Sequence, residues 1–174
     1  EQQGNMQFAE CAVSPQCRKR NDFPRWCALQ TRYICGWGPD CRPGEDGGAT
    51  RAMLERAKMH LAELFAVVGI QEQWHLTLRL LETKLPTYFE GLSAEYDAGN
   101  PANCGEGPRY WYQRYVLKHK CSYVKNQQVK GGKHVLPPRG SDADVALRDV
   151  CWADIALYEY AQGLMKAQAD ACKV

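Results

Sequence analysis

The sequence predicts an α/β fold that is mostly helical in this chain, and the patterns of its four segments lead to this prediction. Residues 50–92 carry the pattern of a helix, a short buried strand and a second helix, an order typical of layered α/β domains. Residues 141–174 carry the pattern of one closing helix. Residues 1–49 are a disulfide-rich loop segment, and residues 93–140 are expected to form a basic insertion.

Length and charge limit the class of protein. The chain has 174 residues, enough for one domain or for a piece of one. Its net charge is +2. Its apolar runs stay short of the roughly 18 residues that a transmembrane helix needs, so none is expected in this chain. The chain begins at Glu1 without a signal-like segment, and we expect either a processed mature protein or a fragment.

Nine cysteines are present, and five of them fall within the first 41 residues, at Cys11, Cys17, Cys27, Cys35 and Cys41. Such clustering in a loop-rich stretch favours disulfides in an oxidising compartment, which argues against a nucleic-acid partner. The alternative, a zinc site, needs closer cysteine pairs or nearby histidines, so no metal is expected. Because nine is odd, one thiol is free or bonded to another chain.

The first helix is predicted to begin after Thr50, a good N-cap residue. Apolar residues recur at steps of three and four and define its buried face: Met53, Leu54, Ala57, Leu61, Leu64 and Phe65. His60 lies on the solvent side of this face, which favours a surface residue over a catalytic one. The loop at residues 35–41, ahead of this helix, is a small ring that a disulfide can close.

Residues 65–70 form an apolar, valine-rich run that is too short for a helix, which predicts a strand buried on both faces. A second helix is predicted over residues 72–85, where Pro86 ends it. One strand cannot make a sheet, and the chain offers only weak partners at residues 33–34 and 116–117. We therefore expect a missing N-terminal half or a partner chain to complete the sheet. The partner chain would make the protein a homo- or hetero-oligomer.

Residues 109–139 contain eight lysines and arginines and no aspartate or glutamate, and aromatic residues interleave with them. Such a block is either the footprint of a polyanion or a solvated face. The closing helix is predicted from Asp142 to about Ala171, with Ser141 as its cap. Its buried stripe is expected at Val145, Cys151 or Trp152, Ile155, Leu157, Tyr158, Ala161, Leu164 and Met165.

Several motifs, taken in order, resemble the C-terminal half of one enzyme family. They include Phe8-Ala9-Glu10-Cys11, Tyr33-Ile34-Cys35-Gly36, Phe65-Ala66-Val67-Val68-Gly69-Ile70, Leu80-Leu81-Glu82, Leu85-Pro86-x-Tyr88-Phe89 and Ala156-Leu157-Tyr158-Glu159-Tyr160-Ala161. The series covers most of the chain and is similar to the heparan sulfate 2-O-sulfotransferase and uronyl 2-sulfotransferase family. The stretch from the valine-glycine run to the proline and aromatics is its most specific part.

The resemblance implies a partial sulfotransferase (P-loop kinase-like) fold, in the Golgi lumen or secreted. It implies transfer of a sulfuryl group from 3′-phosphoadenylyl sulfate (PAPS) to a sugar hydroxyl. The family's phosphosulfate loop and catalytic histidine lie in its N-terminal half, which is absent from this sequence, so we assign no catalytic residue. The alternative is a non-catalytic relative that serves as an extracellular glycan-binding or structural assembly subunit.

The same resemblance implies that residues 122–130, within the basic insertion, form a nucleotide-covering loop, and it implies site residues. Those expected to contact adenosine 3′,5′-bisphosphate, the nucleotide part of PAPS, are Tyr96, Ser122, Gln127 and Lys130. Those expected to contact a sulfated or acidic glycan are Lys125, Lys133 and Arg139. Gln127 replaces a threonine of the family, and Lys125 replaces an arginine and lacks its bidentate fork.

The resemblance also implies two disulfides, Cys11–Cys17 and Cys35–Cys41. Each is expected to stabilise the fold by on the order of 2–3 kcal/mol, as short loops do when unstrained. Cys104 and Cys121 lie in the insertion and can bond to brace it. Cys151 and Cys172 would be about six turns apart on the closing helix, so they cannot bond to each other unless that helix breaks.

Overall fold

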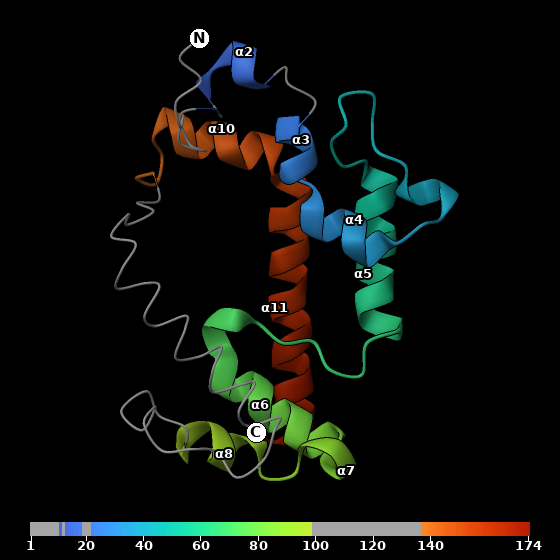
Figure 1. The fold of residues 1–174 in the computed structure, drawn as a ribbon, viewed down its shortest axis with the longest axis vertical. Helices are drawn as coiled ribbons and strands as arrows, with labels where there is room; N and C mark the ends of the chain where they lie inside the picture. The colour runs from blue at the N-terminus through green and yellow to red at the C-terminus, as the bar shows by residue number, and fades with distance from the viewer. Residues whose placement is uncertain (1–10, 12, 19–21, 99–136) are drawn as a thin grey trace, which may run out of the picture.

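The computed structural model describes residues 11, 13–18, 22–98 and 137–174 of the chain, and over these residues the protein is helical. The long helix α11 (Trp152–Cys172) is its axis (Figure 1). Helices α4 (Leu29–Cys35), α5 (Arg51–Glu63) and α6 (Trp74–Lys84) all pack against it. The shorter elements are α2 (Pro15–Arg18), α3 (Asp22–Trp26), η1 (Pro39–Cys41), η2 (Gln71–Gln73), α7 (Pro86–Phe89), α8 (Leu92–Ala98) and α10 (Asp142–Val150).

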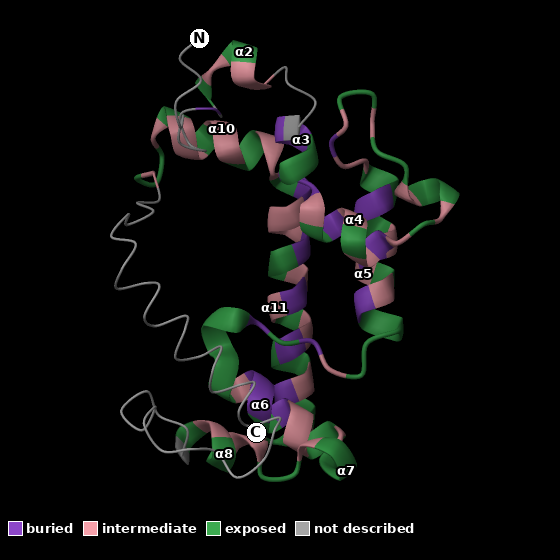
Figure 2. Ribbon diagram, in the orientation of Figure 1, coloured by how far each residue is buried: buried purple, intermediate pink, exposed green. Residues whose placement is uncertain are grey.

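The main apolar core lies along α11, where α4, α5 and α6 meet it (Figure 2). Its most deeply buried large side chains include Met53 on α5, Leu80 on α6 and Met165 on α11. Burying a side chain of this size contributes about 1.5–3 kcal/mol of transfer free energy. The contacts of these helices with α11 are therefore the main apolar stabilisation of the described fold.

Helix α5 begins where the sequence predicts. The Thr50 hydroxyl oxygen accepts a hydrogen bond from the Met53 N–H at 3.2 Å, as expected of an N-cap. Four of the six residues predicted for the buried face are buried, but Leu64 is 68% exposed and Phe65 is 47% exposed. The reason is that α5 ends at Glu63, so the helical stripe ends with it.

The strand predicted over residues 65–70 is wrong, because the described residues contain no β-strand. The segment has no regular secondary structure and buries Val68 and Ile70, and side chains accept the hydrogen bonds of both of their N–H groups. The Val68 N–H donates to Gln168 Oε1 at 3.0 Å, and the Ile70 N–H donates to Thr77 Oγ1 at 3.2 Å. The P-loop kinase-like sheet is thus not seen in the part of the chain that the structure describes.

The cysteine-rich N-terminal segment is more helical than predicted, since α2, α3 and α4 lie within it. These helices have only four to seven residues, too few for a periodic pattern to show. Pro15 and Pro24 are compatible with them because both stand in a first turn, where the missing N–H has no helical partner. Residues 33–34, a weak strand candidate, lie in α4.

The closing helix is two helices, α10 and α11, which meet at Cys151. Ser141 caps α10 as predicted, its hydroxyl oxygen accepting from the Asp144 N–H at 3.3 Å. Because the helix breaks, the two helices bury separate apolar faces. The predicted stripe is therefore wrong at Val145, which is 59% exposed, and at Tyr158, which is 40% exposed. The residues that α11 buries recur every four positions, at Ala153, Leu157, Ala161, Met165 and Ala169. Among the described helices, none combines the length and apolarity needed to cross a membrane.

Candidate anion-binding site

A pocket of about 580 Å³ lies between α3, α4 and the loop that follows α4. Three arginines line it, Arg25, Arg32 and Arg42, together with Tyr33 and Trp37. Trp37 is fully exposed and Tyr33 is 76% exposed. The described residues that line the pocket include no aspartate or glutamate. We call it the arginine pocket.

The arginine pocket is positioned first by Asp154, a residue of α11. The Asp154 carboxylate accepts hydrogen bonds from the N–H groups of Gln30 and Thr31, at 3.1 and 2.8 Å, and from the Thr31 hydroxyl at 2.6 Å. These amides belong to the first turn of α4, where they have no partner within the helix and where the helix dipole favours a negative charge. Arg32 and Tyr33 follow directly, so their backbone is held against α11.

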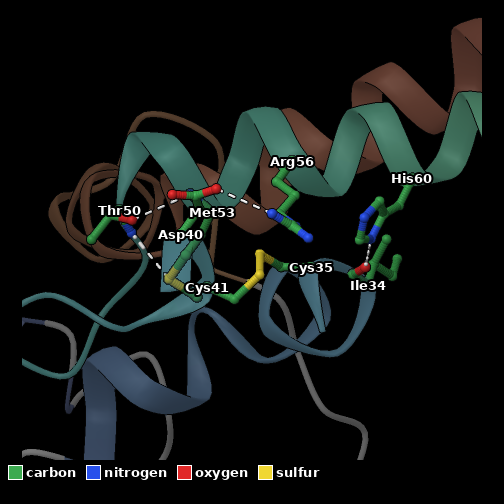
Figure 3. Close-up of a disulfide and its surroundings, with 8 residues drawn as sticks. All are labelled: Ile34, Cys35, Asp40, Cys41, Thr50, Met53, Arg56 and His60. Carbon is green, nitrogen blue, oxygen red and sulfur yellow. Dashed lines mark hydrogen bonds and ion pairs between the residues drawn. A yellow bond between two sulfur atoms is a disulfide. The ribbon is translucent and has the colours of Figure 1, made fainter. Parts of the chain in front are cut away.

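The loop side of the pocket is held by a disulfide and by α5 (Figure 3). Cys35 and Cys41 close the predicted ring, with 5.7 Å between their Cα atoms. Arg56 of α5 pairs with Asp40 of this ring at 3.1 Å. The same guanidinium packs on Gly38, where an added Cβ would lie 2.9 Å from its Cζ. Arg56 therefore holds the ring against α5 at both Gly38 and Asp40.

His60, which was expected to be a surface residue, contacts the backbone of α4. It is half-buried, and its Nδ1 lies 2.9 Å from the Ile34 carbonyl oxygen at the end of α4 (Figure 3). A carbonyl oxygen only accepts, so Nδ1 carries the proton and donates it. His60 thus links α5 to the last turn of α4, and the prediction that it is not catalytic stays a prediction.

The charge of the arginine pocket is not balanced by neighbouring acids. None of Arg25, Arg32 and Arg42 forms an ion pair with a carboxylate among the described residues, whereas Arg18 and Arg148 do. A concave surface lined by one sign of charge concentrates the field and attracts counter-ions. Guanidinium groups bind carboxylate and sulfate-like oxyanions through paired N–H donors. The arrangement can therefore bind a negatively charged group beside an aromatic ring.

Of the seven site residues predicted from the resemblance, the structure describes two. Ser122, Lys125, Gln127, Lys130 and Lys133 lie outside the described residues. The two that are described, Tyr96 and Arg139, do not line the arginine pocket.

Tyr96 belongs to α8 and packs edge-on against two rings of α6, with centroid distances of 6.1 Å to Trp74 and 5.5 Å to His75. Arg139 is exposed, just ahead of α10. The pKa of Asp144 is lowered, mainly by the hydrogen bond from the Gly140 N–H, and the charge of Arg139 adds a smaller contribution. No cluster of three or more His, Cys, Asp or Glu suited to a metal ion occurs among the described residues.

The disulfides implied by the resemblance are present as Cys11–Cys17 and Cys35–Cys41. Cys27 and Cys151 form a further disulfide that the sequence did not predict, 124 residues apart along the chain. Cys104 and Cys121 lie outside the described residues, and Cys172 is the free thiol among the described cysteines. The break between α10 and α11 thus coincides with a covalent link to the N-terminal segment.

The arginine pocket was not predicted from the sequence either, from which residues 35–41 were expected only to form a small ring that a disulfide can close. One local signal was available. Trp37 stands between Gly36 and Gly38, which have no side chains to cover its ring. The arginines gave no signal because they are spread over 18 positions, from Arg25 to Arg42, and only the fold of α4 brings them together.

Comparison with known proteins supplies an independent observation. The chain is 46% identical over 65 residues to human uronyl 2-sulfotransferase, which is 37% of this chain and 14% of the relative, and the mouse protein gives the same values. It is 32% identical over 99 residues to a heparin sulfate O-sulfotransferase of Drosophila melanogaster, which is 55% of this chain and 26% of that relative. The resemblance to this sulfotransferase family is confirmed.

The similarity is partial on both sides. The chain spans about a quarter or less of the length of these sulfotransferases. No protein-family model and no solved structure matches the chain. The family likeness therefore rests on aligned sequence, and the helical arrangement around α11 rests on the structure alone.

Proposed function

We propose that this chain is the C-terminal part of a PAPS-dependent carbohydrate O-sulfotransferase that acts on a glycosaminoglycan-type glycan. The observation that carries the proposal is the 46% identity over 65 residues to uronyl 2-sulfotransferase. The disulfides of the structure suit the oxidising conditions of the Golgi lumen or the extracellular space. In this proposal the P-loop kinase-like sheet and the catalytic base come from a further, N-terminal segment.

The exposed face around residues 64–70 supports the need for such a segment. Leu64 is 68% exposed and the adjacent Phe65 is 47% exposed, at the start of a segment that no described strand pairs with. Exposed apolar side chains beside one another can mark a contact surface. We propose that the N-terminal half, or a partner chain that contains it, covers this face and adds the missing strands.

The residues of this chain would bind and orient the reactants. Sulfuryl transfer requires donors and cations placed where the phosphate and sulfate charges lie. Lys130 would balance a phosphate, and Ser122 and Gln127 would donate hydrogen bonds to it. Tyr96 is half-buried in a cluster with Trp74 and His75, whose rings offer an aromatic surface to a nucleobase. Lys125, Lys133 and Arg139 are the proposed glycan contacts of this site.

Calorimetric titration with adenosine 3′,5′-bisphosphate tests the proposal. The sample is the chain purified together with any partner that it has in its source. We expect saturable binding, and Lys130→Ala should raise Kd about tenfold or more, as loss of a charged hydrogen bond does. Lys166→Ala, which removes an exposed cation of α11, is the matched control and should leave Kd unchanged. A sample that contains all its chains and does not bind the nucleotide would contradict the enzyme proposal.

The second candidate function is a non-catalytic relative that binds acidic glycans. The arginine pocket favours it, because basic and aromatic residues of this chain come together there. Glycan binding by a sample that fails to bind the nucleotide would support this candidate over the first.

A further inference from the structure

We propose that the arginine pocket binds one anionic sugar unit of an acidic glycan. Arg25, Arg32 and Arg42 would hold its carboxylate or sulfate, and Trp37 would pack against the sugar ring. The choice of a glycan as the ligand rests on the proposed function, but the pocket does not. Arg139, the proposed glycan contact that the structure describes, does not line the pocket, so we treat the pocket as a subsite of its own.

The charges are the first support for an anionic ligand. Three guanidinium groups share one pocket without an acidic partner among the described residues that line it. Arginines of one pocket without acidic neighbours produce a positive potential, which favours negative ligands. Asp40, the acid nearest in sequence to the lining residues of the ring, is already paired with Arg56 at 3.1 Å. Arginine stays protonated at every physiological pH, so the pocket keeps its charge.

The aromatic side chains favour a sugar over a bare oxyanion. Trp37 is fully exposed, although a tryptophan ring normally gains by removing apolar surface from water. A sugar ring has one face of C–H groups, which carry partial positive charge and suit the negative face of an indole. An acidic sugar therefore satisfies Trp37 and the arginines at once, whereas inorganic phosphate or sulfate satisfies only the arginines.

The size and rigidity of the pocket are consistent with this ligand. Its volume of about 580 Å³ falls within the roughly 300–1,000 Å³ of small-molecule sites and leaves room for a sugar unit. Its backbone is fixed on one side by Asp154 and on the other by the Cys35–Cys41 ring and Arg56. A pocket that is ordered before binding loses less conformational entropy on binding, which raises affinity.

The experiment is a calorimetric titration of the full chain with a heparin-derived hexasaccharide. Arg32→Ala combined with Arg42→Ala should raise Kd at least about tenfold, since two charged contacts are lost. The matched control is Arg51→Ala with Arg79→Ala, which removes two exposed arginines of α5 and α6 that do not line the pocket. The control should change Kd by less than about twofold, as exposed charges do.

The Trp37→Ala variant distinguishes the contribution of stacking to the affinity from the contribution of charge. We expect it to weaken hexasaccharide binding while the dependence of log Kd on log salt stays as in the unmodified chain, because stacking releases no counter-ions. The arginine double variant should instead flatten this dependence. Trp37 is fully exposed, so its removal leaves no cavity, and an unchanged thermal midpoint shows that the fold is intact.

Three results would overturn the proposal. They are equal losses in the pocket and control double variants, hexasaccharide binding that neither pocket variant alters, and tighter pocket-dependent binding of an acidic peptide or single-stranded DNA. Titration of the same variants with adenosine 3′,5′-bisphosphate keeps the two proposals apart. Nucleotide binding with no pocket-dependent glycan binding removes the pocket proposal alone, and the reverse result removes the enzyme proposal alone.

Discussion

The two halves of the described fold are held together in different ways. Around α4, the backbone is fixed by two disulfides, Cys27–Cys151 and Cys35–Cys41, and by the charged contacts of Asp154. Around residues 65–70 and α6, it is fixed by apolar burial and by neutral hydrogen bonds such as that from the Ile70 N–H to Thr77. The first half therefore depends more on covalent and charged links, and the second depends more on close packing.

The largest expected effect comes from removing the long-range disulfide. Replacing Cys27 and Cys151 by alanine should lower the free energy of unfolding by about 4 kcal/mol, because this link restricts a long loop in the unfolded chain. Replacing Cys35 and Cys41 should cost only about 2 kcal/mol, because that ring is short. Urea unfolding under non-reducing conditions measures both. Equal losses in the two double variants would contradict the assigned role of the long link.

The packed half is tested at Gly69. A Cβ at this position would collide with the side chain of Thr77, whose hydroxyl bonds to the backbone of Ile70. We expect Gly69→Ala to lower the free energy of unfolding by about 1–3 kcal/mol, as overpacking does.

Gly163→Ala on α11 is the matched control for this substitution, since its Cβ meets open space. It should stabilise by about 0.5–1 kcal/mol, because alanine favours a helix interior. Thermal unfolding distinguishes the two alanine variants by the sign of the shift. A stabilised Gly69→Ala variant would show that Thr77 does not restrict this position.

The smallest effect concerns acid. The pKa of Glu82 is lowered from its usual 4.5, first by the hydrogen bond from the Ser93 hydroxyl and then by that from the Ser93 N–H. Since the folded-state pKa lies below the unfolded one, this contribution to stability is present above about pH 4.5 and is lost as pH falls through the folded pKa.

Glu82→Gln should therefore be less stable than the unmodified chain at neutral pH, and the gap should narrow toward about pH 3. Glu90→Gln, at an exposed carboxylate nearby in sequence, is the control. Urea midpoints across this pH range measure both variants, and parallel pH profiles for the two would argue against the role of Ser93.

Local features of the fold could be predicted from the sequence. Thr50 and Ser141 were identified as caps because capping depends on a few adjacent residues. The strand at residues 65–70 was not predictable in the same way. A valine-rich run predicts an extended backbone, which Ile70 has, but pairing depends on a second strand that no local pattern supplies.

Features that join distant parts of the chain were not predictable. Cys27 and Cys151 belong to no common sequence motif. Cys151 was expected inside one continuous helix, but the helix breaks there, so helical spacing did not indicate its partner. The arginine pocket likewise depends on the turn of α4 and the closure of the 35–41 ring. The basic segment at residues 109–139 was prominent in the sequence, yet composition alone does not show which of its charges lie together.

The Cys27–Cys151 link also changes what a broken chain would look like. A single proteolytic cut anywhere between these two positions, including within residues 99–136, leaves the two fragments joined through sulfur. Such nicked molecules would migrate as one species on a non-reducing gel and separate only after a thiol is added. Intactness of the polypeptide is therefore judged only after reduction.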